Sequence, residues 1–151
     1  MGKNVVLKKN FMKTEQIEIA ITLPTSPSIL FNAWINSKEH SAFTGDSASC
    51  SNQEGGKFLI ANEYISGRNL ELNYPNRILQ SWKTKDFPES AENSFIEVFF
   101  TDSTKGCRLK IKHSNIPEGQ GEKYKEGWKE FYFKPMKEYY KSLEINEDKI
   151  I

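Results

Sequence analysis

Hydrophobic positions near the C-terminus repeat at helical spacing. The apolar side chains that follow Trp128 recur after four, seven, eight, eleven and fifteen residues, at Tyr132, Pro135, Met136, Tyr139 and Leu143. These offsets place one apolar stripe along a helix of about 3.6 residues per turn. A helix over 122–143 would be about 30 Å long, because each residue adds about 1.5 Å. The pattern therefore predicts a long helix whose stripe needs a partner surface of similar length.

Two local signals lie at the start and inside this helix. Gly119 and Gly121 precede it, and we interpret them as an entry into the helix and not as a phosphate-binding loop. Pro135 lies within the pattern, where its ring removes the hydrogen bond to the carbonyl of Phe131 and crowds that turn. The sequence therefore predicts a bend at Pro135.

The first 45 residues predict one strand followed by two short helices. Apolar and polar residues alternate over 16–23, which is typical of a half-buried strand, and a proline ends the run. Residues 26–36 begin with a Ser-Pro pair, a common cap and first residue of a helix. Ser37 is the expected cap of a second helix that runs to about residue 43, and Gly45 ends it.

Between residues 47 and 114 the chain alternates apolar and polar positions between regularly spaced turn residues. The expected strands are 47–52, 57–64, 68–74, 77–83, 94–101 and 107–113, with a turn at 66–67 among the connections. Short connections favour antiparallel neighbours. One strand, two helices, six strands and a long helix predict an α+β fold, in which the helix packs on one face of an antiparallel sheet.

The composition is that of an ordinary folded domain without a strong surface charge. The chain has 151 residues, of which 37% are hydrophobic, 13% aromatic and 27% charged, and its net charge is +1. This balance indicates no binding to nucleic acid or to an anionic membrane. We find neither a membrane-spanning run nor the apolar core of a signal peptide. We therefore expect a cytoplasmic protein in which Cys50 and Cys107 are free thiols.

Several short segments, taken in order along the chain, resemble one known family. They read GGKF at 55–58, SWK at 81–83, DFPE at 86–89, NIP at 115–117 and GWKEFYF at 127–133, and AFT at 42–44 also fits. The resemblance is to the activator of heat shock protein 90 ATPase homologue family. It implies a helix-grip, START-like fold, in which a curved seven-stranded antiparallel sheet wraps a long C-terminal helix and two short helices follow the first strand.

The expected domain organisation follows from the extent of this resemblance. We expect an N-terminal arm at 1–13, a single START-like domain at 14–143 and a frayed, charged tail at 144–151. Eukaryotic co-chaperones of the family carry a separate N-terminal domain, and no segment here is long enough to hold it. The chain therefore resembles only their C-terminal domain.

The residues that could carry chemistry form no catalytic pattern. His40 lies on a short charged helix and is expected to be exposed. His113 continues the apolar face of its strand, so it is either an acid–base group in a pocket or a hydrogen-bonded histidine at the edge of the core. Neither cysteine lies in a nucleophile motif, and no spacing predicts a metal site. We therefore expect no catalytic residue, metal or cofactor, and no enzyme activity.

Glu71 is the carboxylate whose position the sequence leaves open. The strand at 68–74 presents either its even-numbered or its odd-numbered residues to the interior. The pattern of the family implies the odd-numbered set, which would place Glu71 near a cavity. An inward carboxylate is costly unless it is paired, so Glu71 either orients a ligand or forms an ion pair with a neighbouring arginine.

Two functions remain open. In the first, an apolar space between the sheet and the long helix, open near the short helices, binds a small hydrophobic molecule without catalysis. In the second, which the resemblance implies, an exposed surface binds a chaperone of the heat shock protein 90 type. The candidate ligand-binding residues are Trp34, Phe43, Phe58, Ile60, Glu71, Trp82, Val98, Phe100, Leu109, Ile111, His113, Trp128 and Tyr132.

Overall fold

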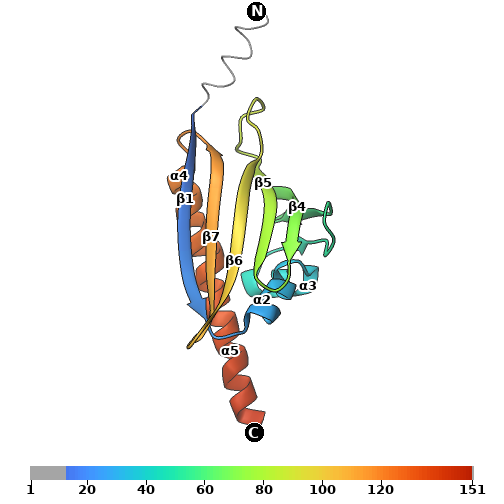
Figure 1. Cartoon of the computed structure of the whole chain (residues 1–151), viewed down its shortest axis with the longest axis vertical. Helices are drawn as coiled ribbons and strands as arrows, with labels where there is room; N and C mark the ends of the chain where they lie inside the picture. The colour runs from blue at the N-terminus through green and yellow to red at the C-terminus, as the bar shows by residue number, and fades with distance from the viewer. Residues whose placement is uncertain (1–12, 151) are drawn as a thin grey trace, which may run out of the picture.

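A seven-stranded antiparallel sheet lies against one long helical segment in the computed structural model, which describes residues 13–150 and, for side chains, residues up to 144. The strand order is β1-β7-β6-β5-β4-β3-β2. The long helix runs along one face of the sheet behind β1 and β7, and two short helices lie behind β5 and β4 (Figure 1). The predicted α+β, helix-grip architecture is confirmed. The arm predicted at 1–13 falls almost entirely outside the described residues.

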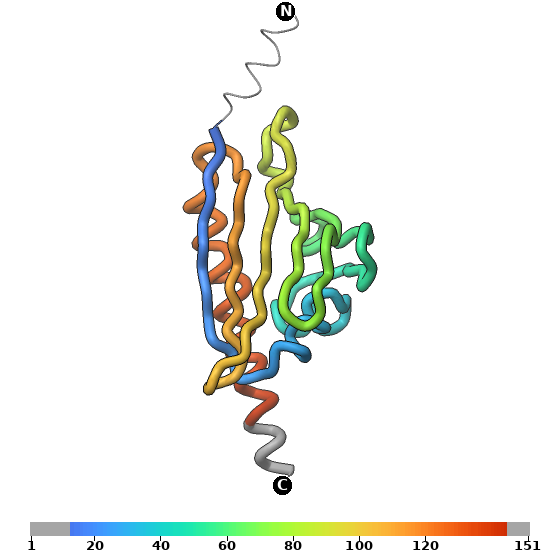
Figure 2. Tube along the Cα trace, in the orientation of Figure 1, coloured from blue at the N-terminus to red at the C-terminus, as the bar shows by residue number. Residues whose placement is uncertain are grey.

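The elements follow the predicted order along the chain. The strands are β1 (Thr14–Leu23), β2 (Ala48–Ser49), β3 (Lys57–Ile60), β4 (Ile65–Asn73), β5 (Arg77–Thr84), β6 (Ser94–Ser103) and β7 (Gly106–Pro117). The helices are α2 (Pro27–Trp34), α3 (Ser37–Thr44), α4 (Gly121–Gly127), the π-helical segment η1 (Trp128–Phe133) and α5 (Lys134–Ile150). The first strand β1 pairs with the last strand β7, so segments far apart in the sequence lie side by side in the sheet (Figure 2).

The connection between β3 and β4 differs from the prediction. β3 ends at Ile60, and the turn is made by residues 61–63, which all adopt left-handed backbone conformations with φ of 56°, 54° and 67°. Gly67, predicted to lie in a turn, lies inside β4, where a Cβ would come within 2.5 Å of the Phe58 ring. Gly67 therefore allows the Phe58 ring to approach the backbone closely, and it does not form a turn. The strand predicted at 47–52 is reduced to two residues, Ala48–Ser49.

The caps of the short helices are confirmed in one case and corrected in the other. The Ser26 hydroxyl accepts a hydrogen bond of 3.2 Å from the Ile29 backbone N–H, as predicted for α2. The cap of α3 is Asn36, whose side-chain oxygen accepts from the backbone N–H of residue 39 at 2.9 Å. Ser37, the predicted cap, instead accepts a hydrogen bond from the backbone N–H of Cys50 at 2.8 Å. Ser37 therefore joins α3 to the segment that follows β2.

The long helix is interrupted by the six π-helical residues of η1. The Lys134 backbone N–H bonds the carbonyl of Lys129, five residues earlier. The wider turn ends two residues before Pro135, where it relieves the crowding that a proline causes in an α-helix. The bend predicted there stays a prediction, and α5 continues to Ile150, beyond the predicted end at residue 143. No helix among the described residues is long and apolar enough to cross a membrane.

The buried stripe of the long helix differs from the predicted one in its second half. The buried side chains of the long helix include a series at four-residue spacing: Tyr124, Trp128, Tyr132, Met136 and Tyr140. Tyr139 is only half-buried and Leu143 is 41% exposed, although both were predicted to face the sheet. The four-residue spacing through η1 moves the inward face from Tyr139 to Tyr140.

The entry into the long helix is held by a carboxylate from the first strand. Glu15 accepts hydrogen bonds from the backbone N–H groups of Gly119 at 3.0 Å and Gly121 at 2.7 Å. These two bonds hold the pKa of Glu15 below its ordinary value. A Cβ at Gly121 would lie 2.5 Å from the Glu15 carboxylate, so the glycine makes this approach possible. The interpretation of these glycines as a helix entry is confirmed.

Candidate functional site

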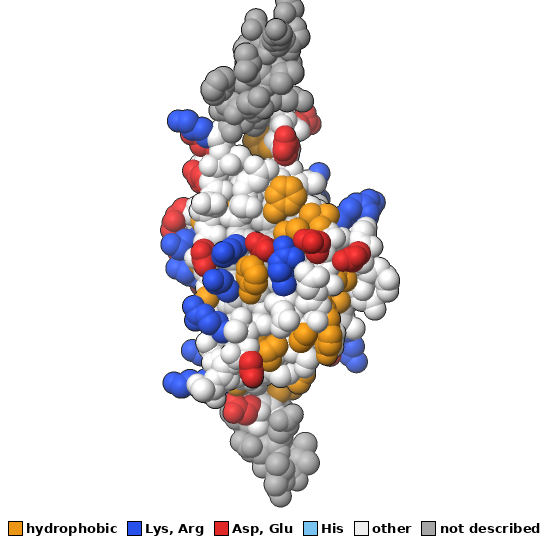
Figure 3. Space-filling view, viewed as in Figure 1, with side chains coloured by type: hydrophobic (Ala, Val, Ile, Leu, Met, Phe, Trp, Pro, Cys, Tyr) orange, Lys and Arg blue, Asp and Glu red, His pale blue; other side chains and the backbone are white. Residues whose placement is uncertain are grey.

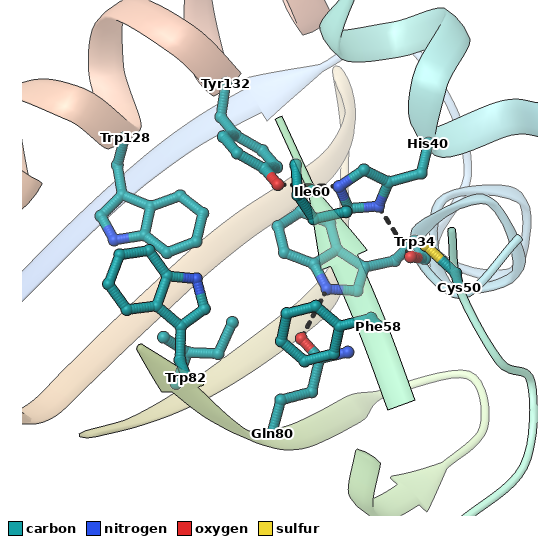
Figure 4. Close-up of a pocket in the computed structure, with 10 residues that line it drawn as sticks. Trp34, His40, Cys50, Phe58, Ile60, Gln80, Trp82, Trp128 and Tyr132 are labelled. Carbon is teal, nitrogen blue, oxygen red and sulfur yellow. Dashed lines mark hydrogen bonds between the residues drawn. The ribbon is translucent and has the colours of Figure 1, made fainter. Parts of the chain in front are cut away.

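The candidate site lies where α2, α3, β5 and η1 meet, between the sheet and the long helix (Figure 4). Six of the predicted residues line one small cavity here: Trp34, Phe58, Ile60, Trp82, Trp128 and Tyr132. The volume of this cavity is about 10 Å³, which is about the space of a single water molecule. The expectation of an apolar cavity that would hold a hydrophobic molecule is therefore not met in this structure.

Aromatic rings from three elements fill the space that the curved sheet leaves. Trp128 of η1 stacks on Trp34 of α2, with ring centroids 6.3 Å apart and planes at 25°. Trp82 of β5 lies 5.6 Å from Trp128 on another side, and Tyr132 lies 4.7 Å from it. Offset and edge contacts of this kind pack large flat side chains without a void. Of the two possibilities for these rings, that they line a ligand space or that they fill it, the structure shows the second, because the rings interdigitate.

His113 lies in the middle of a hydrogen-bond chain inside this core. The Trp128 indole N–H donates to His113 Nδ1 at 3.1 Å, which makes Nδ1 the acceptor. His113 Nε2 therefore carries the proton and donates to Ser94 Oγ at 2.8 Å, and Ser94 donates to the Trp82 carbonyl at 2.6 Å. Burial lowers the pKa of His113 to about 3. His113 is thus the neutral, hydrogen-bonded core histidine that was one of its two interpretations.

His40 is part of the same core, which corrects the expectation that it is exposed. Its side chain is 3% exposed, because α3 turns His40 and Phe43 toward the long helix. His40 Nδ1 donates to the Trp34 carbonyl at 2.8 Å, so the Tyr132 hydroxyl donates to Nε2 at 2.8 Å. Burial lowers the pKa of His40 to about 4. The spacing of His40 and Phe43, three residues apart on one helix face, was the available signal.

A third chain of polar groups leads from the tryptophans to the edge of the sheet. The Trp34 indole N–H donates to Gln80 at 3.1 Å, and the Gln80 amide donates to Asn69 at 2.8 Å. Asn69 donates in turn to the Ser51 carbonyl at 2.7 Å. Sequence reasoning did not single out Gln80, although it alternates with Trp82 on the inner face of β5. This chain satisfies polar groups that burial would otherwise make costly.

Glu71 lies outside the site, on the outer face of the sheet. A register shift between Asn69 and Glu71 adds one residue to β4, so that Asn69 points inward and Glu71 points outward. Arg77 pairs with Glu71 at 3.2 Å and with Glu97 at 2.7 Å. The ion pair proposed as the alternative is confirmed, and the inward position was wrong. The outer face shows charges of both signs side by side (Figure 3).

The remaining predicted residues are buried in the core but do not line the cavity: Phe43, Val98, Phe100, Leu109 and Ile111, together with His113. Residues that line it without having been predicted are His40, Cys50, Gln80 and Ile96. Both cysteines are free, as predicted, and burial raises the pKa of each thiol to about 11. The thiols are therefore protonated and weakly nucleophilic near neutral pH.

Two tyrosines of the long helix offer a test of these polar chains. Within the described part of the chain, the Tyr140 hydroxyl is the one buried side-chain polar atom that lacks a hydrogen-bond partner. Tyr140→Phe should raise the free energy of unfolding by about 1 kcal/mol, because it removes an unsatisfied group. Tyr132→Phe, the matched control, should lower it by about 1 kcal/mol, because it leaves His40 Nε2 without its donor. Urea unfolding measures both changes, and equal effects would contradict this assignment.

Residues 24–141 match the sequence model of a family described as Activator of Hsp90 ATPase homolog 1-like protein. The chain belongs to this family. The matched residues include the short helices, the six strands β2 to β7, and the long helix as far as residue 141. The resemblance drawn from short sequence segments is therefore confirmed by a match over most of the chain.

Named members of this family are similar to the chain over most of its length. It is 28% identical over 116 residues to the activator of 90 kDa heat shock protein ATPase homolog of Dictyostelium discoideum, which covers 77% of the chain and 30% of the relative. It is 28% identical over 125 residues to homolog 1 of Homo sapiens, which covers 83% of the chain and 37% of the relative. The chain therefore spans about a third of the length of these relatives.

A solved structure extends the comparison to three dimensions. The crystal structure of an HSP90 activator from Plasmodium falciparum superposes with a TM-score of 0.68 at 30% identity. The superposition covers 78% of the present chain and 90% of the Plasmodium chain. A family member described as an HSP90 activator thus shares the helix-grip fold across nearly its whole solved chain.

Proposed function

We propose that this domain is a chaperone-associated interaction module that binds an Hsp90-type chaperone through its surface. The observation that carries the proposal is the filled core, in which the cavity beside Trp128 measures only about 10 Å³. A core without room for a ligand leaves the surface of the domain as the place for recognition. The relatives described as Hsp90 activators indicate the class of partner.

Binding of a small hydrophobic molecule, the other function expected from the sequence, has less support. Ligand pockets typically measure about 300–1,000 Å³, far more than the cavity beside Trp128. The two candidate polar anchors do not serve a ligand either. Glu71 lies on the outer face, and both ring nitrogens of His113 are already engaged within the protein.

A non-catalytic role agrees with the state of the titratable groups in the core. His40 and His113 are neutral near pH 7, since burial holds both pKa values at about 4 and about 3. Each ring also makes two hydrogen bonds to neighbouring protein groups. A general acid or base needs a pKa near the working pH and access to a substrate. These two histidines meet neither condition.

The test is direct binding to the Hsp90-type chaperone of the organism that makes this protein. We expect saturable binding of the folded chain in calorimetry, together with a change in the ATPase rate of the chaperone. Because chaperones also bind unfolded chains, the Trp128→Ala variant, which disturbs the core, is the control. Absence of binding, or tighter binding by the Trp128→Ala variant than by the unmodified chain, would refute the proposal.

A further inference from the structure

The long helix carries a second apolar stripe beside the buried one, and this stripe is open to solvent at Phe131. Phe131, Pro135 and Tyr139 recur every four residues, and we call these three residues the outer stripe. Phe131 is 69% exposed, the largest value among the exposed large hydrophobic side chains of the described residues. Pro135 and Tyr139 are half-buried. Side chains four residues apart on a helix are neighbours, so these three side chains lie in one row along the helix.

The π-helical segment presents Phe131 to solvent. Tyr132 and Phe133, the next two residues of η1, are both 6% exposed, so two consecutive side chains face the core while Phe131 faces away. The Phe131 ring lies beside Gly127, where a Cβ would be 3.9 Å from its Cδ2 atom. Because Gly127 has no side chain, it does not shield the Phe131 ring from solvent. Segments of π-helix are found frequently at functional sites.

The border of the outer stripe is charged but balanced. Glu130, Lys134 and Glu138 follow one another along the solvent side of the stripe, and Lys134 pairs with Glu130 at 3.5 Å. On the side of α3, the Tyr139 hydroxyl donates to Glu39 at 3.3 Å. An apolar strip with a polar rim is the arrangement of a protein–protein contact. The order acidic, basic, acidic along this border is complementary to a partner surface whose charges follow the order basic, acidic, basic.

The outer face of the sheet is a weaker candidate for the same role. Its central aromatic side chain, Phe99, is half-buried and lies under the ammonium groups of Lys110 and Lys112, at 5.9 Å and 5.7 Å from the ring centroid. Glu97 and Arg77 pair beside it. These cations and the ion pair cover the Phe99 ring at the centre of that face.

We infer that the outer stripe is the surface with which this domain docks on an Hsp90-type chaperone. The inference rests on the function proposed above and adds the site of contact. A helix with apolar side chains at four-residue spacing is the form that enters an apolar groove on a partner. We expect the groove on the chaperone to accept the Phe131 ring and to carry charges of both signs along its rim. Aromatic side chains that become buried in such a contact often carry much of the affinity.

The test compares two exposed phenylalanines that differ in their location. Phe131→Ala should weaken binding to the chaperone by about tenfold or more, because it removes the most exposed aromatic side chain of the outer stripe. Phe95→Ala removes the same group from β6 on the outer face of the sheet, where Phe95 is 37% exposed. This control should bind within about twofold of the unmodified chain, since only a minority of contacts are sensitive to truncation. Calorimetry with the full-length chaperone and melting temperatures of all three chains are the measurements.

The outcomes separate this inference from the proposed function. Weakened binding by Phe131→Ala alone, at an unchanged melting temperature, supports the outer stripe as the docking surface. Unchanged binding by Phe131→Ala, or equal weakening by Phe95→Ala, would overturn the docking surface while the proposed function stands. No binding by the unmodified chain would overturn both.

Discussion

Trp128→Ala should lower the free energy of unfolding by about 3–5 kcal/mol, the range typical of a large aromatic side chain removed from a core. Trp128 is 3% exposed and lies against Trp34, Trp82 and Tyr132. It joins the long helix to the sheet and to α2, so truncation opens a cavity between three elements at once. The surrounding rings are large and rigid, which limits how far they collapse into the space.

The loss of stability in Trp128→Ala also has a polar component. Trp128 donates to His113 Nδ1, and truncation leaves that nitrogen buried without a donor. Trp128→Phe is therefore the informative second variant, because it keeps most of the ring contact but removes the N–H group. We expect it to cost about 1–3 kcal/mol, the cost of leaving a buried polar group unsatisfied.

Urea unfolding followed by circular dichroism measures both variants, because Trp128 itself contributes to the fluorescence signal. A loss below about 1 kcal/mol for Trp128→Ala would contradict the central position of the long helix in the core. A loss for Trp128→Phe as large as that for Trp128→Ala would mean that the hydrogen bond, and not the packing, dominates.

Acidification from pH 6.5 to 4.5 should destabilise the protein by several kcal/mol, because two core histidines are buried in the neutral form. Their folded pKa values of about 4 and about 3 lie below the ordinary value of 6.5. Between these values the unfolded chain binds protons on His40 and His113 that the folded chain does not bind. Stability therefore rises with pH across this window and is lost as pH falls. Above pH 6.5 both states are neutral at these positions, so the dependence ends.

The measurement is the slope of unfolding free energy against pH between 4.5 and 6.5. Two such histidines give up to about 2.7 kcal/mol per pH unit, since each contributes up to about 1.36. The carboxylates Glu15 and Asp86 have lowered pKa values, so their contributions begin to be lost near the lower edge of this window and are lost mainly below it. His40→Gln and His113→Gln should each halve the slope, whatever their effect on stability at pH 7. A flat profile in the unmodified chain would contradict the burial of both rings.

Much of the fold could be predicted from local patterns. The alternation over 107–113 marks the inner face of β7, where Cys107, Leu109 and Ile111 are fully buried. The Ser-Pro pair before α2 is a local signal as well, because a cap needs only its own backbone. Patterns of this kind act over a few residues, so they are readable without knowledge of distant partners.

Of the predicted site residues, the aromatic ones come together in one core, whereas Glu71 lies outside it. Trp34, Trp82 and Trp128 come together because large apolar side chains on inward faces share one core. The position of Glu71 depended on a one-residue register shift in β4, which no local pattern shows. The burial of His40 depended on Tyr132, 92 residues away, which supplies its hydrogen bond.

The sequence by itself determined the order of elements, their antiparallel pairing and the inward aromatic set, because helical and strand periodicities are local properties of the chain. Only the tertiary structure decided whether the aromatic side chains line a cavity or fill it, since packing depends on rings contributed by α2, β5 and η1 together. The tertiary structure also decided which side of the long helix stays exposed to solvent. The π-helical turn before Pro135 directs Tyr140 inward and leaves Phe131 exposed, and that turn forms where the helix must follow a curved sheet while accommodating a proline.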